Sequence, residues 1–329
     1  MATQETQQLD AIISNRRAML AMGGVALAGL AFSGTAKAQA AATITDFDIL
    51  NFALNLEYLE AQYYTLATSG QTIDMMGLGI GAGSSATGGG TVTTKNKNGY
   101  ATCKVPFAST TIAAYANETA TEERKHVAFL RSALGSNTVA MPNIDLFNSF
   151  NALGGLIGVP NFDPFANDLT FILGAYIFED VGVSAYHGAA PLITDKKNIL
   201  PAAVGIHAVE AYHAGLVRTT IYGLDQGVIT IPGIPGAGAA ALATKISGVR
   251  ATLDGTASKT PDDIGVGTAN VALNTSSSNV VASTVVTADA NSLAWSRTTT
   301  QVLSIVYASQ ATPPAPGGFF PKGLNGTIK

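Results

Sequence analysis

The sequence contains little cysteine and little charge, and each shortage narrows what the protein can be. Cys103 is the only cysteine in 329 residues, so the chain has no internal disulfide framework, no CxxC pair and no cysteine-rich metal knuckle. Charged residues make up 12% of the sequence, about half the usual share. The net charge is −4 and the basic residues form no long run. We therefore expect no nucleic-acid partner.

Apolar residues and glycine are abundant instead. Hydrophobic residues account for 47% of the chain, and 35 residues are glycine. A chain of this length and composition can bury a sizeable core, in one large domain or two modest ones. Low charge combined with many small residues is more typical of a secreted or envelope protein than of a cytosolic enzyme.

The N-terminus has the pattern of an export signal. Arg16 and Arg17 precede an uncharged run of small and apolar residues, and cleavage is expected after Ala38 or Ala40. Paired arginines before a mildly apolar core resemble the twin-arginine signal, whose pathway carries folded proteins. We expect residues 1–40 to be removed, which would leave a periplasmic or extracellular protein with no stable membrane span. The alternative is an uncleaved anchor, because the run is nearly long enough to span a bilayer.

Four segments predict a helical bundle over residues 44–223. In each, apolar residues recur at three- and four-residue spacing, as in amphipathic helices. Residues 69–104 are rich in Gly, Ser, Thr and Asn and predict a long inserted loop with room for a hairpin. The predicted helices cover residues 46–68, 109–134, 167–189 and 195–223.

The remainder, residues 224–329, is rich in Gly, Pro, Thr, Ser and Val. We expect it to form an extension that packs on the bundle, with Phe319 and Phe320 as anchors. The fold class is therefore predicted to be mainly α, with few strands. The elements expected in the extension are helices within 239–253 and 292–307 and one or two strands within 270–287.

Each apolar stripe of the bundle carries a glutamate where a hydrocarbon side chain is expected. Burying an unpaired carboxylate costs several kcal/mol, so four such positions predict a shared partner. Two of the helices also carry Glu-x-x-His, a spacing that puts both side chains on one helix face, where they can bind one cation. In chain order the four helices supply Glu, Glu-x-x-His, Glu and Glu-x-x-His. Together these residues are the ligand set of two metal ions in a bundle core. The predicted ligands are Glu57, Glu123, His126, Glu179, Glu210 and His213.

The first helix offers two glutamates for this set. Glu60 lies one turn after Glu57 and could be the ligand in its place, or a hydrogen-bond acceptor behind the ligands. We favour Glu57, because Tyr64 follows it by seven residues. Tyr186 follows Glu179 at the same spacing. Both tyrosines are expected to be core residues whose hydroxyls hydrogen-bond a ligand carboxylate.

The two Glu-x-x-His pairs differ in their surroundings. Glu123 is flanked by Glu122 and by Arg124 and Lys125, so this stretch taken alone can also be a solvated charged face. Glu210 has apolar neighbours on both sides, which leaves little room for a surface position. The second pair is therefore the stronger indication of a buried site.

These motifs resemble the ferritin-like superfamily, and in particular the ferritin-like domain of desiccation-related proteins from plants and bacteria. The resemblance covers most of residues 46–326 and implies the fold more than a reaction. The inserted loop and residues 256–287 are enlarged relative to that family. The segments that carry the resemblance are 56–64 (LEYLEAQYY), 210–218 (EAYHAGLVR), 294–307 (AWSRTTTQVLSIVY) and 317–326 (GGFFPKGLNG).

Two hypotheses of function follow. The first is a di-iron or di-manganese oxidoreductase that acts on oxygen or peroxide in stress protection, because glutamate and histidine suit both metals and such pairs cycle between oxidation states. Peroxide disproportionation needs no external electron donor, which suits a chain without a cysteine set to deliver electrons. The alternative is a non-enzymatic envelope protein of desiccation tolerance, with a structural or vestigial metal site and contacts to extracellular polymers. Iron storage in a closed shell is disfavoured, since the loop and the extension obstruct shell packing. A smaller homo-oligomer is compatible with the sequence.

Overall fold

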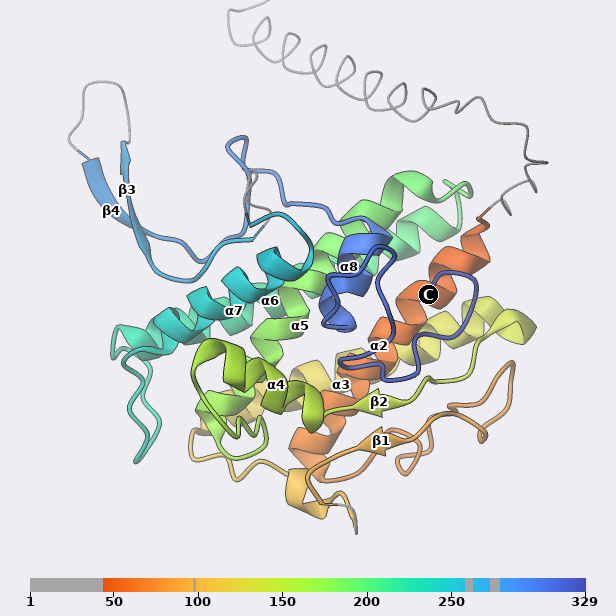
Figure 1. The fold of residues 1–329 in the computed structure, drawn as a ribbon, viewed down its shortest axis with the longest axis horizontal. Coiled ribbons are helices and arrows are strands. Elements are labelled where there is room, and N and C mark those ends of the chain that lie inside the picture. Colours follow the sequence, from red (N-terminus) through yellow and green to blue (C-terminus); the bar gives the residue numbers. More distant parts are fainter. Residues whose placement is uncertain (1–43, 97–98, 258–262, 273–278) are drawn as a thin grey trace, which may run out of the picture. The chain divides into compact units, whose positions relative to one another are not determined.

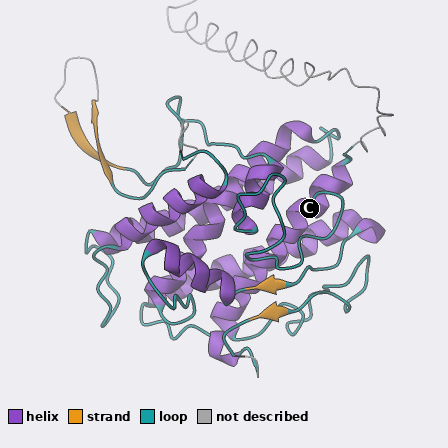
Figure 2. Ribbon diagram, in the orientation of Figure 1, coloured by secondary structure: helices purple, strands orange, loops and turns teal. Residues whose placement is uncertain are grey.

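The computed structural model describes residues 44–96, 99–257, 263–272 and 279–329. The predicted signal peptide, residues 1–40, lies outside the described residues. Residues 44–329 form one compact unit. Helices dominate this unit and strands are short (Figures 1 and 2), so the predicted mainly α fold is confirmed.

Four long helices make the bundle (Figure 1). Helix α2 packs chiefly against α3, and α5 packs chiefly against α6. Contacts of α2 with α5 and of α3 with α6 join the two pairs. The helices are α2 (Asp46–Ser69), α3 (Thr110–Leu134), α5 (Asp168–Ala189) and α6 (Ile199–Asp225).

Side-chain caps explain where these helices begin. Thr45, Ser109 and Asn167 each accept a hydrogen bond from a backbone N–H in the first turn of α2, α3 and α5. Helix α6 begins at Ile199, later than predicted, because the Asp195 carboxylate accepts from the next backbone N–H groups and holds a turn there.

Helices α2 and α5 are buried on nearly all sides. Helix α5 continues through a 3₁₀ turn to Leu192 and is long and apolar enough to cross a membrane, but 89% of its most apolar window is buried inside the protein. It is therefore the central core helix of the bundle. Helices α7 (Ala239–Leu253) and α8 (Thr299–Val306) pack against α5, and α4 (Asn148–Ile157) packs against α7.

Among the described residues of the inserted loop, 69–96 and 99–104, no two strands pair as a hairpin. Strand β1 (Val92–Thr93) pairs in parallel with β2 (Ile144–Asp145), which follows α3. Because the two strands are far apart in the sequence, no short turn sequence between them indicates that they pair. Helix α4 was not predicted, because it is short and two of its ten residues are glycine, a poor helix former. Three-residue 3₁₀ turns lie at Ala101–Cys103, Gly135–Asn137 and Ala190–Leu192.

The extension contains the predicted elements in modified form. Strand β3 (Thr268–Ala272) pairs antiparallel with β4 (Asn279–Ser283), and the two strands project from the bundle (Figure 1). Helix α8 is shorter than the predicted 292–307. Its start is fixed by a capping box in which Thr298 and Gln301 bond each other's backbone.

Buried ion pairs attach the extension to the bundle. The Asp180 carboxylate on α5 accepts from Arg218 on α6 at 2.9 Å and from Arg250 on α7 at 2.8 Å. The Asp263 carboxylate accepts from Arg250 at 2.7 Å and from Arg297 at 2.9 Å. All five side chains are buried. The network therefore joins α5, α6, α7 and two loop segments through charge-assisted hydrogen bonds.

The end of the chain returns to the first helix of the bundle. Phe319 is buried, and its ring centroid lies 4.9 Å from that of Phe178 on α5, so the predicted anchoring is confirmed. Asn325 and Asn55 on α2 form a reciprocal pair. The Asn55 amide donates to the Asn325 carbonyl at 2.9 Å, and the Asn325 N–H donates to the Asn55 side chain at 3.1 Å.

Candidate metal centre

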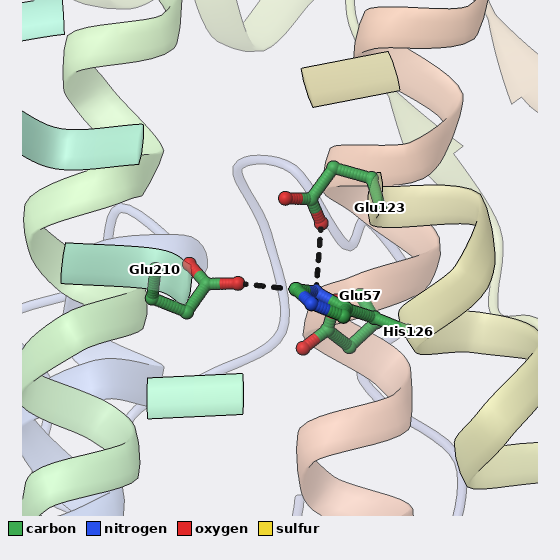
Figure 3. Close-up of side chains that lie close together, drawn as sticks. All are labelled: Glu57, Glu123, His126 and Glu210. Atoms are coloured by element: carbon green, nitrogen blue, oxygen red, sulfur yellow. Dashed lines mark ion pairs between the residues drawn. The ribbon is translucent and has the colours of Figure 1, made fainter. Parts of the chain in front are cut away.

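The six predicted ligand side chains come together between the four long helices. Each lies on the stripe of its helix that faces the other three, and all six are buried. Figure 3 shows Glu57 from α2, Glu123 and His126 from α3 and Glu210 from α6 directed toward one another. The other two are Glu179 from α5 and His213 from α6.

A first group surrounds His126. Its Nδ1 lies 3.2 Å from Glu57 Oε2, 3.4 Å from Glu210 Oε1 and 3.7 Å from Glu123 Oε2. One ligand atom from each of these four residues lies within 4.8 Å of all the others. That spacing is suited to a single cation held by one nitrogen and three carboxylate oxygens.

A second group surrounds His213. Its Nδ1 lies 2.9 Å from Glu123 Oε1 and 3.7 Å from Glu179 Oε2. Ligand atoms of His213, Glu123, Glu179 and Glu210 again lie within 4.8 Å of one another. Glu123 and Glu210 belong to both groups, so each of these two carboxylates would contribute to holding both cations.

Unpartnered polar atoms test whether cations fit here. Among the described residues, eleven buried side-chain atoms lack a hydrogen-bond partner, and eight of them belong to this cluster. Leaving a buried polar atom unpaired costs about 1–3 kcal/mol, more if it is charged. Carboxylate oxygens and imidazole nitrogens are ligands that iron and manganese accept. Cations between these atoms would supply the missing partners, so the residues fit a metal site.

Two tyrosines hold the outer carboxylates by bonds that cross between helices. The hydroxyl of Tyr64 on α2 donates to Glu179 Oε1 on α5, and that of Tyr186 on α5 donates to Glu57 Oε1 on α2. Each tyrosine thus bonds the glutamate of the opposite helix. In both glutamates the other oxygen, Oε2, remains without a hydrogen-bond partner.

Glu122 is a residue of the site that sequence reasoning missed. Its Oε2 lies 2.7 Å from Nε2 of His213. Because a carboxylate accepts, Nε2 carries a hydrogen, so Nδ1, which faces the carboxylates of the centre, is the ring nitrogen that could bind a cation. We had considered Glu122 only as part of a charged face. Its partner lies on α6, 91 positions along the chain, and no spacing in the sequence signals that contact.

Glu60 is buried but belongs to neither group of ligand atoms. Gly182 on α5 lies beside it. A Cβ atom at Gly182 would be 2.4 Å from Glu210 Oε2 and 3.6 Å from Glu60 Oε1. Because glycine has no side chain, position 182 leaves room for the Glu210 carboxylate. The Glu60 carboxyl lies next to the same space.

Burial opposes ionisation of most of these carboxyl groups. It raises the pKa of Glu57, of Glu60 and of Glu210 above the usual range. Burial is also the main reason why the pKa of Glu179 rises to about 8, although the nearby His213 acts in the opposite direction. Without a cation, these groups tend to hold protons.

Glu123 differs because both histidines contact it. Burial opposes its charge, but close contacts with His126 and His213 outweigh burial and lower its pKa to about 2. Burial likewise opposes the charge on His213, yet its contact with Glu123 and the charge of Glu179 raise its pKa to about 11. In the absence of metal, the negative charge of the centre thus concentrates on Glu123.

Comparisons with known proteins agree with this geometry. A family model described as a ferritin-like domain matches residues 45–223, which is more than half of the chain. The chain belongs to the ferritin-like domain family. This ferritin-like protein is 28% identical to the desiccation-related protein PCC13-62 of Craterostigma plantagineum over 285 residues, 86% of this chain and 83% of that protein. It is 26% identical to the ferritin-like catalase Nec2 of Nesocodon mauritianus over 288 residues, 86% and 84% of the two chains.

Both alignments are longer than the bundle, so they include part of the extension. The similarity to desiccation-related proteins expected from the sequence is therefore confirmed. No solved structure shows a significant match to this ferritin-like protein.

Proposed function

We propose that this ferritin-like protein holds two iron or two manganese ions at the centre and disproportionates hydrogen peroxide. The observation that carries the proposal is the concentration of unpartnered buried ligand atoms in two overlapping groups. The relative named ferritin-like catalase, aligned over 86% of this chain, supports peroxide as the substrate. The ions would be held by Glu57, Glu123, His126, Glu179, Glu210 and His213.

The reaction balances without a further reactant. One peroxide is reduced to two waters by two electrons and two protons, and a second is oxidised to dioxygen and returns the same electrons and protons. When bound, a pair of iron or manganese ions supplies reversible two-electron redox chemistry. Because the reaction needs no external electron donor, it suits a chain that has a single cysteine and therefore no cysteine-ligated redox centre to deliver electrons.

The chain's own part is to position the donors and to exclude bulk water. Tyr64 and Tyr186 hold one oxygen of Glu179 and of Glu57, which leaves the second oxygen of each toward the centre. Glu122 fixes the ring of His213. Rigidly held ligands of this kind need little reorganisation during a change of metal charge.

The test compares protein loaded with iron and protein loaded with manganese, because the wrong metal can imitate an inactive site. Oxygen release from hydrogen peroxide is followed with an electrode. Glu210→Ala and His213→Ala should each abolish release, since each removes a ligand of the centre. Glu118→Ala is the matched control, because Glu118 is an exposed glutamate on α3. Its activity should equal that of the wild type.

A structural role is the second candidate, favoured by the similarity to a desiccation-related protein. In that case the ions stabilise the bundle and the protein contacts envelope or extracellular polymers. A fully loaded wild type that releases no oxygen, yet unfolds at a far higher temperature than its metal-free form, would decide for this role. The same two ligand variants would then lower the unfolding temperature and have no activity to lose.

We also propose that the protein is exported after removal of residues 1–40, by the twin-arginine route. Arg16-Arg17 and the small residues before position 41 support this. Mass spectrometry of protein recovered outside the cytoplasm should find a new N-terminus at Gln39 or Ala41. An intact N-terminus at Met1 or Ala2 would contradict cleavage.

A further inference from the structure

A large cavity opens at the surface where the extension meets the bundle. It has a volume of about 540 Å³ and lies between α4, α7, α8 and the segment 315–321. Most of its lining side chains are apolar, among them Leu153, Ile246 and Leu253. We call it the outer cavity. Its volume lies in the range of small-molecule sites and far exceeds the size of a peroxide molecule.

A second, inner cavity lies deeper in the protein. Its volume is about 10 Å³, which is room for about one water molecule. Glu60 is its only charged lining residue, and Gly182 lies opposite apolar side chains of α2 and α5. The inner and outer cavities share three lining side chains, which therefore form the partition between them: Ile177, Ile305 and Phe319.

The inner cavity reaches the edge of the metal centre. Gly182 lines it, and a Cβ atom on this glycine would lie 2.4 Å from Glu210 Oε2. Gly182 thus adjoins both the inner cavity and the Glu210 carboxylate, which itself does not line the cavity. The outer cavity, the three partition side chains, the inner cavity and Gly182 therefore follow one another from the surface toward Glu210.

We propose that small neutral molecules of the size of hydrogen peroxide reach the centre by this route, with the Glu60 carboxyl as the polar contact at its inner end. The inference rests on the proposed function, because it assumes a metal centre that acts on such a molecule. Apart from Glu60, the partition and the inner cavity are apolar. They disfavour ions, whose desolvation is costly, and so select neutral solutes. The route also gives the extension a role, because Ile305 of α8 and Phe319 form two of the three partition side chains.

Another cavity offers a competing path. A cavity of about 20 Å³ lies at the other end of α5 and is lined by Ala53, Ala203 and Tyr186, among others. Tyr186 contacts Glu57, so this cavity also approaches the centre. It has no charged lining residue and therefore offers a matched position for a control.

The experiment measures access without relying on turnover. Protein loaded with ferrous iron is mixed with nitric oxide, a small neutral ligand, and its association is followed by stopped-flow absorption. Ile305→Phe enlarges a partition side chain and should slow association about tenfold, because a close-packed interior must then move to let the probe pass. Phe319→Leu reduces a partition side chain and should speed association. Ala53→Leu, which fills the competing cavity, should leave the rate unchanged.

The signs of these effects separate the route from general damage. A variant that is merely destabilised opens more often and cannot bind the probe more slowly. Slower association in Ile305→Phe together with faster association in Phe319→Leu supports the route, even if the wild type releases no oxygen from peroxide, in which case only the proposed catalase function fails. Wild-type rates in both partition variants, or slowing confined to Ala53→Leu, would overturn the route.

Discussion

At the scale of single residues, the absence of a side chain at Gly182 leaves room for the Glu210 carboxylate, which both groups of ligand atoms share. Alanine is more favourable than glycine inside a helix by about 1 kcal/mol, so Gly182→Ala would stabilise α5 if space allowed. The new Cβ would instead stand 2.4 Å from Glu210 Oε2. We expect Gly182→Ala to lower both the metal content after desalting and the unfolding temperature of the loaded protein, measured by elemental analysis and calorimetry.

The control for this prediction lies on the neighbouring helix. Gly205 on α6 is exposed, and a Cβ atom there meets nothing within 4 Å. Gly205→Ala should therefore keep the wild-type metal content and raise the free energy of unfolding by about 0.5–1 kcal/mol. A wild-type metal content in Gly182→Ala would show that Glu210 is not held by the space beside Gly182.

Glu122 allows a second test at this scale. Its carboxylate bonds the outward nitrogen of His213, and loss of such a contact typically weakens metal binding about 10–100-fold. We expect Glu122→Ala to weaken binding in this range, measured by titration against a chelator of known affinity. Glu122→Gln, which keeps an acceptor oxygen, should bind more tightly than Glu122→Ala. Equal affinity of Glu122→Ala and Glu118→Ala would count against the role of Glu122.

The residues that meet at the centre could be chosen from the sequence, because each is in phase with the apolar stripe of its own helix. This periodicity can be read from each segment of the sequence alone. The crossed bonds of Tyr64 and Tyr186 and the contact of Glu122 depend on distances between helices, which spacing along the chain does not encode. That the six residues bind metal stays a prediction until metal analysis is done.

At the scale of secondary-structure elements, buried charge holds the extension on the bundle. Asp180 is shared by Arg218 and Arg250, and removal of one partner from a buried pair costs about 3–5 kcal/mol. We expect Asp180→Ala to lower the free energy of unfolding by about that amount and to expose the extension to limited proteolysis. Chemical denaturation and peptide mapping would measure the two effects.

An exposed ion pair provides the comparison. Lys95 and Asp163 are 3.0 Å apart, with 67% of the lysine side chain exposed. Lys95→Ala should change the free energy of unfolding by less than about 1 kcal/mol. Similar losses in the two variants would mean that burial does not set the strength of the Asp180 network.

Which elements could be predicted depends on how local their signals are. The long helices carry periodic apolar stripes and caps such as Ser109 and Asn167, so their bounds were predicted to within a few residues. Helix α4 carries Gly154 and Gly155 in its second half, which obscures it. The pairing of β1 with β2 joins residues 52 positions apart, and no turn sequence connects them.

At the scale of the whole molecule, the centre makes the metal-free protein sensitive to alkali. The pKa of Glu179 rises from 4.5 to about 8, mainly through burial. Burial opposes the charge on His213, but its contacts with Glu123 and Glu179 raise its pKa from 6.5 to about 11. The folded protein thus keeps protons that the unfolded chain releases, so its free energy of unfolding falls as pH rises. We expect the unfolding temperature of the metal-free protein to drop between pH 5 and about 8.

Metal should remove this dependence, because bound ligands have already lost their protons and metal affinity rises with pH. The difference in unfolding temperature between the loaded and metal-free forms should therefore widen across the same interval, as scanning calorimetry can show. A metal-free form whose unfolding temperature is constant or rises with pH would mean that the buried carboxyl groups are not protonated.

The reciprocal bonds between Asn55 and Asn325 have a consequence for biosynthesis. They join positions 270 residues apart, so the buried side-chain oxygen of Asn55 accepts this hydrogen bond only when residue 325 is present. During translation α2 leaves the ribosome well before residue 325 does. The contact between α2 and residue 325 therefore forms late relative to α2 itself, and a truncation before position 325 removes hydrogen bonds from a helix that was made first.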